Sequence, residues 1–180
     1  GDDRERGGHF YVRPQGEHRV SRRYVQDTPV LKTRFTTDSG TVEVTDLMPV
    51  YPRGRPDRFM QPQRELLRIV EVIDGSVEMA ISFAPRPGYG RDAVKLDPRG
   101  RLGWACEHRD GLYLLHSDLP LSRPAGERLT GRVRLAAGDR RHLSLTFAQR
   151  DVGVVAPLGQ DANKRLQVTV NWWQKWSARC

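Results

Sequence analysis

The side chains best suited to catalysis or metal binding are five histidines, and their spacing favours neither role. They are His9, His18, His108, His116 and His142. A zinc site draws His, Cys and carboxylate ligands from short, characteristic spacings, and none of these histidines has a Cys or carboxylate at such a spacing. Ser, His and Asp occur without the nucleophile elbow that would bring them together. The sequence therefore predicts no metal, no cofactor and no catalytic triad.

Carboxylates offer a second route to chemistry, because a pair of them can act as general acid and general base. The candidates are Glu43, Asp46, Glu71 and Glu78. All four lie in segments that alternate between apolar and polar residues, and charged residues in such segments usually face solvent. Asp46 differs from the others because it ends its segment in the sequence TDLMP, where an Asp can tie a turn together.

The elements that would position these side chains are strands. From Leu31 to Thr36 apolar and polar residues alternate, Asp38-Ser39-Gly40 supplies a turn, and the alternation resumes at Val42. The stretch Glu65 to Ile73 is nearly continuous in apolar residues, which predicts a central strand covered on both faces. Asp74-Gly75 predicts a tight hairpin to a partner strand at 77–83. A further hairpin is expected between residues 128–135 and 142–147, around Ala137-Gly138-Asp139.

Short strands separated by frequent turn signals indicate an all-β fold, and we predict an antiparallel, supersandwich-like β-sandwich over residues 1–160. The period changes after Gly159, where Leu166, Val170 and Trp173 recur at helical spacing. Residues 161–180 are therefore expected to form one C-terminal α-helix. Trp172, Trp173 and Trp176 crowd its end, and they must pack on the sandwich or on a partner.

The composition limits the partners. Of 180 residues, 30 are Lys or Arg and 22 are Asp or Glu, which gives a net charge of +8. The basic residues are scattered through turns and strands, and the sequence has no zinc-finger spacing and no basic helix, so we expect no nucleic-acid partner. No apolar run approaches the length of a membrane span, and no secretory signal stretch is present, which favours a cytoplasmic protein without a membrane partner.

Three stretches resemble a known family. They are RRYVQDTPVLKTRFTTDSGTVEVTDLMP from Arg22, LLRIVEVIDGSVEMAISFAPRPGYGR from Leu66, and NWWQKWSARC at 171–180. Together they are similar to the N-terminal β-sandwich domain of bacterial glycoside hydrolase family 15 proteins, the glucoamylase and trehalase-like enzymes. The resemblance extends from His9 to Cys180. Its most specific parts are residues 22–24, 44–49, 85–91 and 172–176.

The resemblance implies a non-catalytic domain that docks on an (α/α)6 barrel and shapes its entrance, with helix 161–180 as the link to that barrel. The family hydrolyses α-glucosides with inversion, which requires two carboxyl groups on opposite sides of the bond. The family's two catalytic glutamates belong to the barrel, so no residue here inherits them. We therefore expect no hydrolysis by this chain, and contact with an α-glucoside only through the parent enzyme.

Six residues are candidates for the interface with the barrel or for the substrate entrance. Arg86, Tyr89 and Arg91 belong to the constrained loop PRPGYGR, and Trp172, Trp173 and Trp176 to the helix. Arginine and large aromatic residues are enriched where partners dock. With the tryptophans uncovered, the chain is expected to form homo-oligomers. Two alternatives are a stand-alone carbohydrate-binding sandwich, with Trp104, Tyr89 or Tyr51 as stacking platforms, and a basic RNA-binding or scaffold protein.

Overall fold

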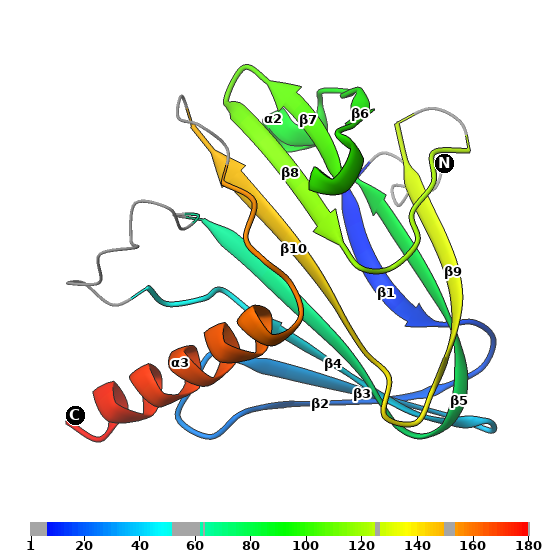
Figure 1. Ribbon diagram of the computed structural model, residues 1–180, viewed down its shortest axis with the longest axis vertical. Coiled ribbons are helices and arrows are strands. Elements are labelled where there is room, and N and C mark those ends of the chain that lie inside the picture. The colour runs from blue at the N-terminus through cyan, green and yellow to red at the C-terminus, as the bar shows by residue number, and fades with distance from the viewer. Residues whose placement is uncertain (1–6, 52–61, 63, 125–126, 150–153, 180) are drawn as a thin grey trace.

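The computed structural model describes residues 7–51, 62, 64–124, 127–149 and 154–179. They form two antiparallel sheets that share one strand, and one long helix (Figure 1). The main sheet has the strand order β2-β3-β4-β5-β10-β8-β7-β6, and the small sheet is β1-β5-β9. The strands are β1 His9–Pro14, β2 Arg19–Tyr24, β3 Leu31–Thr37, β4 Gly40–Leu47, β5 Glu65–Ala84, β6 Leu96–Pro98, β7 Trp104–His108, β8 Gly111–Ser117, β9 Leu129–Ala136 and β10 Arg140–Ala148. The predicted all-β sandwich with a C-terminal helix is confirmed.

The shared strand β5 overturns one predicted hairpin. Asp74-Gly75 does not reverse the chain, and both residues lie within one strand that is 20 residues long in total. Gly75 has a φ of 68°, and a Cβ there would lie 2.2 Å from the carbonyl oxygen of Ser39. Gly75 therefore interrupts the regular backbone geometry of the strand without ending it, and this is possible because glycine has no Cβ. Residues before it pair with β4 and β10, and residues after it pair with β1 and β9.

The second predicted hairpin is also wrong in its pairing. Strands β9 and β10 are joined by a tight turn, but β9 pairs with the second half of β5 and β10 with the first half. The turn rests on β5 instead: the Gly138 amide donates to the Val72 carbonyl at 3.0 Å, and the Ala137 amide donates to the Gly75 carbonyl at 2.8 Å. The chain changes sheet at this turn, as β5 does beside it.

The core lies between the two sheets. Val70 and Val72 from the first half of β5 face the same interior as Met79 and Ile81 from the second half, and all four are buried. Leu67 and Ile69 point to the opposite face of the main sheet and are buried there as well. The first half of β5 is thus covered on both faces, as its near-continuous apolar sequence predicts.

One ion pair ties the two sheets together at the edge of this core. The Arg68 Nε donates to Asp46 Oδ1 at 2.6 Å across the β4–β5 pairing. The same guanidinium donates to the Phe10 carbonyl of β1 at 3.1 Å and lies 4.5 Å from the centre of the Phe10 ring. Asp46 therefore pairs with Arg68, which also contacts the small sheet, whereas the sequence suggested that Asp46 would stabilise a turn.

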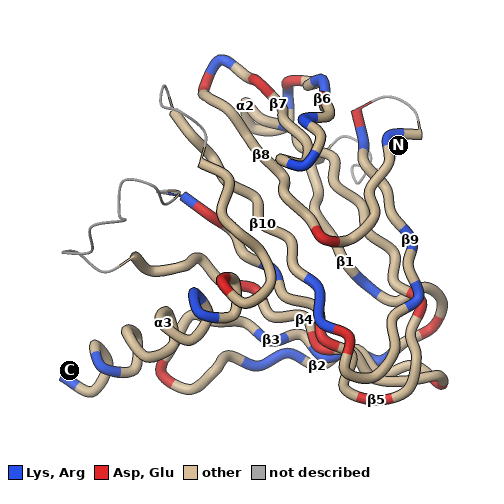
Figure 2. Tube along the Cα trace, viewed as in Figure 1, with Lys and Arg blue, Asp and Glu red and all other residues tan. Residues whose placement is uncertain are grey.

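Charged residues of both signs are distributed along the strands (Figure 2). Glu43 is an exception to the solvent-facing position expected for it, because it is buried among cations of neighbouring strands. Its carboxylate lies 2.6 Å from Lys32 Nζ, 3.3 Å from Arg34 Nη2 and 3.5 Å from Arg23 Nη2. Burial alone would raise the pKa of Glu43, but the Lys32 hydrogen bond and the three positive charges lower it below the ordinary value.

Helix α3, Gln160–Ser177, lies across the outer face of the main sheet (Figure 1). It begins one residue before the predicted boundary, and its N-cap is Gly159, with Asp161 in the first turn. No helix among the described residues is long and apolar enough to cross a lipid bilayer.

Candidate functional site: the anchored C-terminal helix

The first half of α3 is fixed to the main sheet by a small apolar cluster. Ala162 is fully buried, and Leu166 and Val170 pack beside it at helical spacing. The sheet contributes Leu67 and Ile69 of β5, together with Leu47 of β4 and Val30. The predicted apolar face of the helix is thus correct at its N-terminal end, where it covers the sheet.

A buried carboxylate anchors the same part of the helix. The Glu65 side chain has no exposure, and its Oε1 accepts hydrogen bonds from Ser144 Oγ at 2.6 Å and from Arg165 Nη2 at 3.1 Å. Its Oε2 accepts a hydrogen bond from the Tyr51 hydroxyl. Burial and then the nearby Glu65 charge raise the pKa of Tyr51 far above its ordinary range, so this hydroxyl stays a donor. Thr169, also buried, accepts a bond from the Val50 amide at 3.0 Å.

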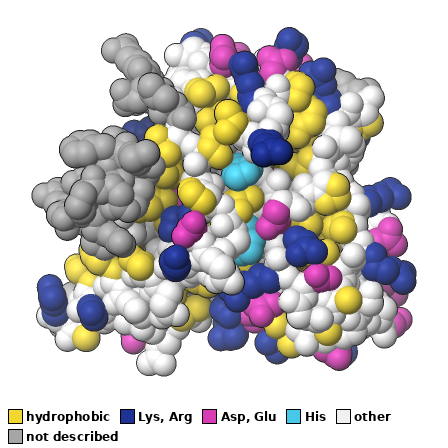
Figure 3. Space-filling model, in the orientation of Figure 1, with side chains coloured by type: hydrophobic (Ala, Val, Ile, Leu, Met, Phe, Trp, Pro, Cys, Tyr) yellow, Lys and Arg dark blue, Asp and Glu magenta, His cyan; other side chains and the backbone are white. Residues whose placement is uncertain are grey.

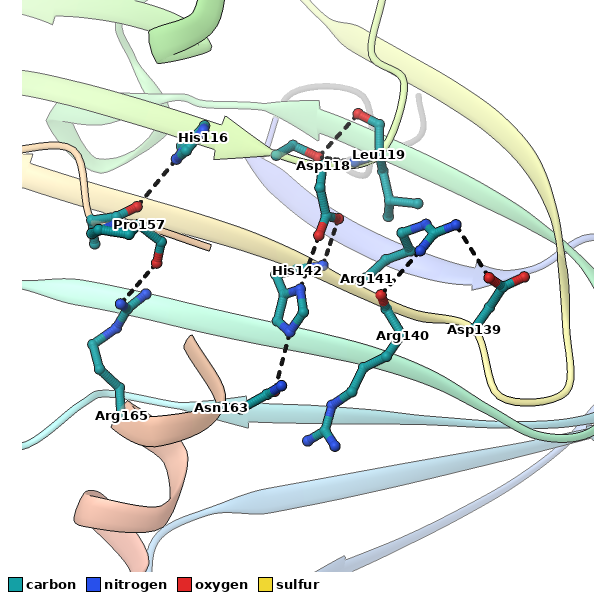
Figure 4. A network of polar contacts seen from close by, with 12 residues as sticks. His116, Asp118, Leu119, Asp139, Arg140, Arg141, His142, Pro157, Asn163 and Arg165 are labelled. Atoms are coloured by element: carbon teal, nitrogen blue, oxygen red, sulfur yellow. Dashed lines mark hydrogen bonds and ion pairs between the residues drawn. The ribbon is translucent and has the colours of Figure 1, made fainter. Parts of the chain in front are cut away.

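A second polar network lies beside the first (Figure 4). His142 of β10 is buried, and Asp118 accepts from its backbone amide at 2.6 Å and lies 2.9 Å from its Nδ1. The other ring nitrogen lies 3.1 Å from Asn163 Oδ1 of the helix.

The segment before the helix is also held by hydrogen bonds. His116 bonds the Ala156 carbonyl at 3.1 Å, and Arg165 donates to the Pro157 carbonyl at 2.8 Å. These contacts fix the segment that enters the helix.

These networks join the helix and the segment before it to the main sheet. A glycosidase needs two carboxyl groups that reach the substrate from opposite sides. Glu65 is fully buried and occupied by three donors, and both ring nitrogens of His142 have partners. Histidine side chains are visible near the middle of one face, with charged groups of both signs beside them (Figure 3). Among the described residues no three His, Cys, Asp or Glu side chains are grouped so that they could hold a metal ion.

The last turns of α3 carry the tryptophans predicted to dock. Trp172 and Trp176 are 37% and 51% exposed, whereas Trp173 is partly buried. The three indoles stack edge to face, with ring centres 4.9 Å and 5.6 Å apart. The Trp173 Nε1 is buried without a hydrogen-bond partner among the described residues. The helix therefore has an anchored N-terminal half and an exposed aromatic C-terminal end.

The other predicted interface group lies elsewhere. Tyr89 lies in the short turn α2, Pro87–Gly90, and Arg86 and Arg91 flank this turn. In Figure 1, α2 is far from the end of α3. Tyr89 is fully exposed and has a φ of 59°. Arg86 is paired with Glu127, and Arg91 is exposed. The structure thus places the two predicted groups on separate parts of the surface.

The aromatic residues considered as sugar platforms do not form one strip. Tyr89 is exposed on α2, but Trp104 of β7 is partly buried and packs against the core. Tyr51 is also partly buried, and its hydroxyl is bound to Glu65. A sandwich that binds carbohydrate by stacking needs an exposed aromatic face, and these three residues do not provide it.

Sequence reasoning missed the buried anchors. Glu65 and Arg165 are separated by 100 positions, and Asp118, His142 and Asn163 come from three separate elements. Their separation hides the contacts, because each residue alone resembles an ordinary polar position. The one available signal was a charged residue, Glu65, at the start of the most apolar strand.

Comparison with known proteins gives three findings. The profile of the trehalase-like N-terminal family matches residues 3–122. A trehalase of Mycolicibacterium smegmatis (strain ATCC 700084 / mc(2)155) is 24% identical over 186 residues, which cover 94% of this chain and 27% of that protein. A structure of a protein named as a kojibiose phosphorylase from the human microbiome matches with a TM-score of 0.46 at 10% identity, over 94% of this chain and 25% of its own. The chain thus spans 27% and 25% of the lengths of these two proteins.

Proposed function

Because the chain belongs to the family of trehalase-like N-terminal domains, we propose that it is the non-catalytic N-terminal domain of an inverting α-glucosidase of glycoside hydrolase family 15. In this proposal the sandwich precedes α3, and α3, Gln160–Ser177, joins it to an (α/α)6 barrel. The domain docks on that barrel and shapes the entrance through which an α-glucoside reaches the catalytic groups.

One observation carries the docking proposal: α3 is held rigidly along its first half and exposes large aromatic side chains at its end. Trp172 and Trp176 show 37% and 51% of their surface, although burying a large apolar side chain contributes about 1.5–3 kcal/mol. Exposed aromatic groups on a rigid support are typical of the centre of an interface. The buried Glu65–Arg165 pair and the His142 contacts supply that support.

The experiment uses the full-length enzyme that contains this domain. Trp172→Ser with Trp176→Ser should lower its melting temperature and its rate of α-glucoside hydrolysis, whereas Leu102→Ser, an exposed apolar residue away from α3, should change neither. The 180-residue chain alone should release no glucose from maltose, trehalose or starch. Unaltered stability and rate in the double tryptophan variant would refute the docking surface, and glucose release by the purified chain would refute the non-catalytic role.

The carbohydrate-binding alternative has weaker support, because its three candidate aromatic residues are not assembled on one face. The RNA-binding alternative relies on net charge, and Figure 2 shows both basic and acidic residues along the described chain.

A further inference from the structure

A groove of about 810 Å³ crosses the outer face of the small sheet, on the side away from the core. Its floor is made by the small residues Ala80 and Ser82 of β5. Tyr11 and Arg13 of β1 form one wall, and Thr130 and Arg132 of β9 belong to the other. We call this site the arginine groove. Neither the tryptophan end of α3 nor the turn α2 contributes to it.

The strand register places two arginines opposite each other across the floor. Arg13 pairs with Ala80, and Ala80 pairs with Arg132 on its other side. Neighbouring strands are about 4.8 Å apart, so the two arginine backbones are separated by about 10 Å. The Ala80 methyl group fills little of the space between them. Two guanidinium groups on long side chains can therefore reach one ligand bound above Ala80.

These arginines lack acidic partners. Among the described residues, no carboxylate lines the groove and none forms an ion pair with Arg13, Arg128 or Arg132. The nearest acidic position in the register, Glu78, lies opposite Arg134, outside the groove lining. Elsewhere in this chain clustered cations surround a carboxylate, as they do at Glu43. The groove therefore concentrates positive charge that the described part of the chain does not neutralise.

The β1 wall is pre-organised. The Tyr11 ring stacks on His9, with the ring centres 5.3 Å apart. The guanidinium of Arg13, two residues after Tyr11 in β1, lies 4.6 Å from the Tyr11 ring centre. His9 in turn bonds Ser82 Oγ at 2.8 Å. Burial, and then the charges of Arg128 and Arg86, lower the pKa of His9, which agrees with a positive local field. Tyr11 remains 36% exposed, but its ring contacts both His9 and Arg13, so we assign it the role of positioning Arg13.

We propose that the arginine groove binds a small phosphate-bearing anion of about the size of a sugar phosphate. Arginine suits this ligand because its planar guanidinium donates paired hydrogen bonds to phosphate oxygens. Ser122 and Thr130 add hydroxyl groups to the lining, which suit the polar remainder of the ligand. The volume is within the usual range of small-molecule sites. This proposal is independent of the function proposed above, because it uses no residue of the docking surface.

The test is calorimetric titration of the 180-residue chain at constant ionic strength with inorganic phosphate, glucose 6-phosphate and glucose. We expect saturable binding of both phosphates and none of glucose. Removing each arginine by Arg13→Gln or Arg132→Gln should weaken glucose 6-phosphate binding by about tenfold or more, because each substitution removes a charge-assisted hydrogen bond. Arg101→Gln, an exposed arginine of the short helix η2 (Gly100–Leu102), is the matched control and should bind as the wild type does.

Thermal unfolding separates loss of binding from loss of fold. Neither groove arginine forms an ion pair among the described residues, so both variants should melt as the wild type does. Two results would overturn the proposal: no saturable heat with either phosphate at millimolar concentration, or equal affinity in the wild type and both variants. Binding of an RNA oligomer without binding of glucose 6-phosphate would overturn it as well, because that result indicates a polyanion surface instead of a small-molecule groove.

Discussion

Replacing Glu65 by Gln tests whether the buried ion pair holds α3 on the sheet. The substitution keeps the size of the side chain but removes the charge that faces Arg165, whose own side chain is 12% exposed. The new amide group would also face the Ser144 and Tyr51 hydroxyls, which both donate to the carboxylate. Breaking one side of a buried pair costs about 3–5 kcal/mol, and this is a large part of a typical domain stability of about 5–15 kcal/mol.

Urea unfolding monitored by circular dichroism and by tryptophan fluorescence measures this loss. We expect Glu65→Gln and Arg165→Gln each to lower the free energy of unfolding by about 3–5 kcal/mol. The double variant should lose clearly less than the sum, because it leaves no uncompensated charge. Lys164→Gln, one position before Arg165, breaks an exposed pair with Asp161 and should leave the midpoint unchanged. A loss below about 1 kcal/mol in Glu65→Gln, or strict additivity with Arg165→Gln, would refute the anchoring role.

Three further predictions follow from other parts of the molecule. The pKa of Glu43 is lowered below its ordinary value of 4.5, so its contribution to stability is present above that pH and lost as the pH falls through the folded-state pKa. Glu43→Gln should therefore reduce stability at neutral pH and flatten the acid limb of a pH–stability profile relative to Glu107→Gln, an exposed control; parallel acid limbs would contradict this. Tyr89→Ala with Arg91→Ala in the full-length enzyme should weaken domain docking and lower hydrolysis, and unchanged activity and melting temperature would indicate that α2 is only a surface turn. In sedimentation, the isolated chain should self-associate in the micromolar range through the tryptophan end of α3, whereas Trp172→Ser with Trp176→Ser should stay monomeric; a monomeric wild type would exclude this oligomer.

Local pattern was sufficient for the strands and the helix. Alternation located β3 and β4, the apolar run of Glu65 to Ile73 indicated a strand covered on both faces, and the helical period located α3 to within one residue at its start. These features depend on neighbours in sequence, so a single chain reveals them. The exposed turn at Tyr89 was also placed correctly outside the sheets.

Pairing could not be predicted in the same way. Asp74-Gly75 has the local preference for a hairpin, but two strands from the distant segment 129–148 pair with β5 on either side of that point. Such tertiary pairing overrides a turn preference that is worth little alone. For the same reason, the contacts of Glu65 with Arg165 and of His142 with Asp118 and Asn163 were not visible in the sequence. The arginine groove likewise exists only through the register of β1, β5 and β9.

The continuous strand β5 has a consequence for how the domain folds and opens. Since one uninterrupted strand supplies a central strand of both sheets, we expect the two sheets to form together. The partner strands of β5 come from both ends of the chain, so its pairing requires contacts between residues far apart in sequence. Topologies that depend on such contacts fold slowly. We therefore expect the amide hydrogens on both sides of Gly75 to exchange with solvent through the same rare global opening, as one cooperative unit. The irregular point at Gly75 would then be a change of direction within a single folding unit, and not a boundary between two.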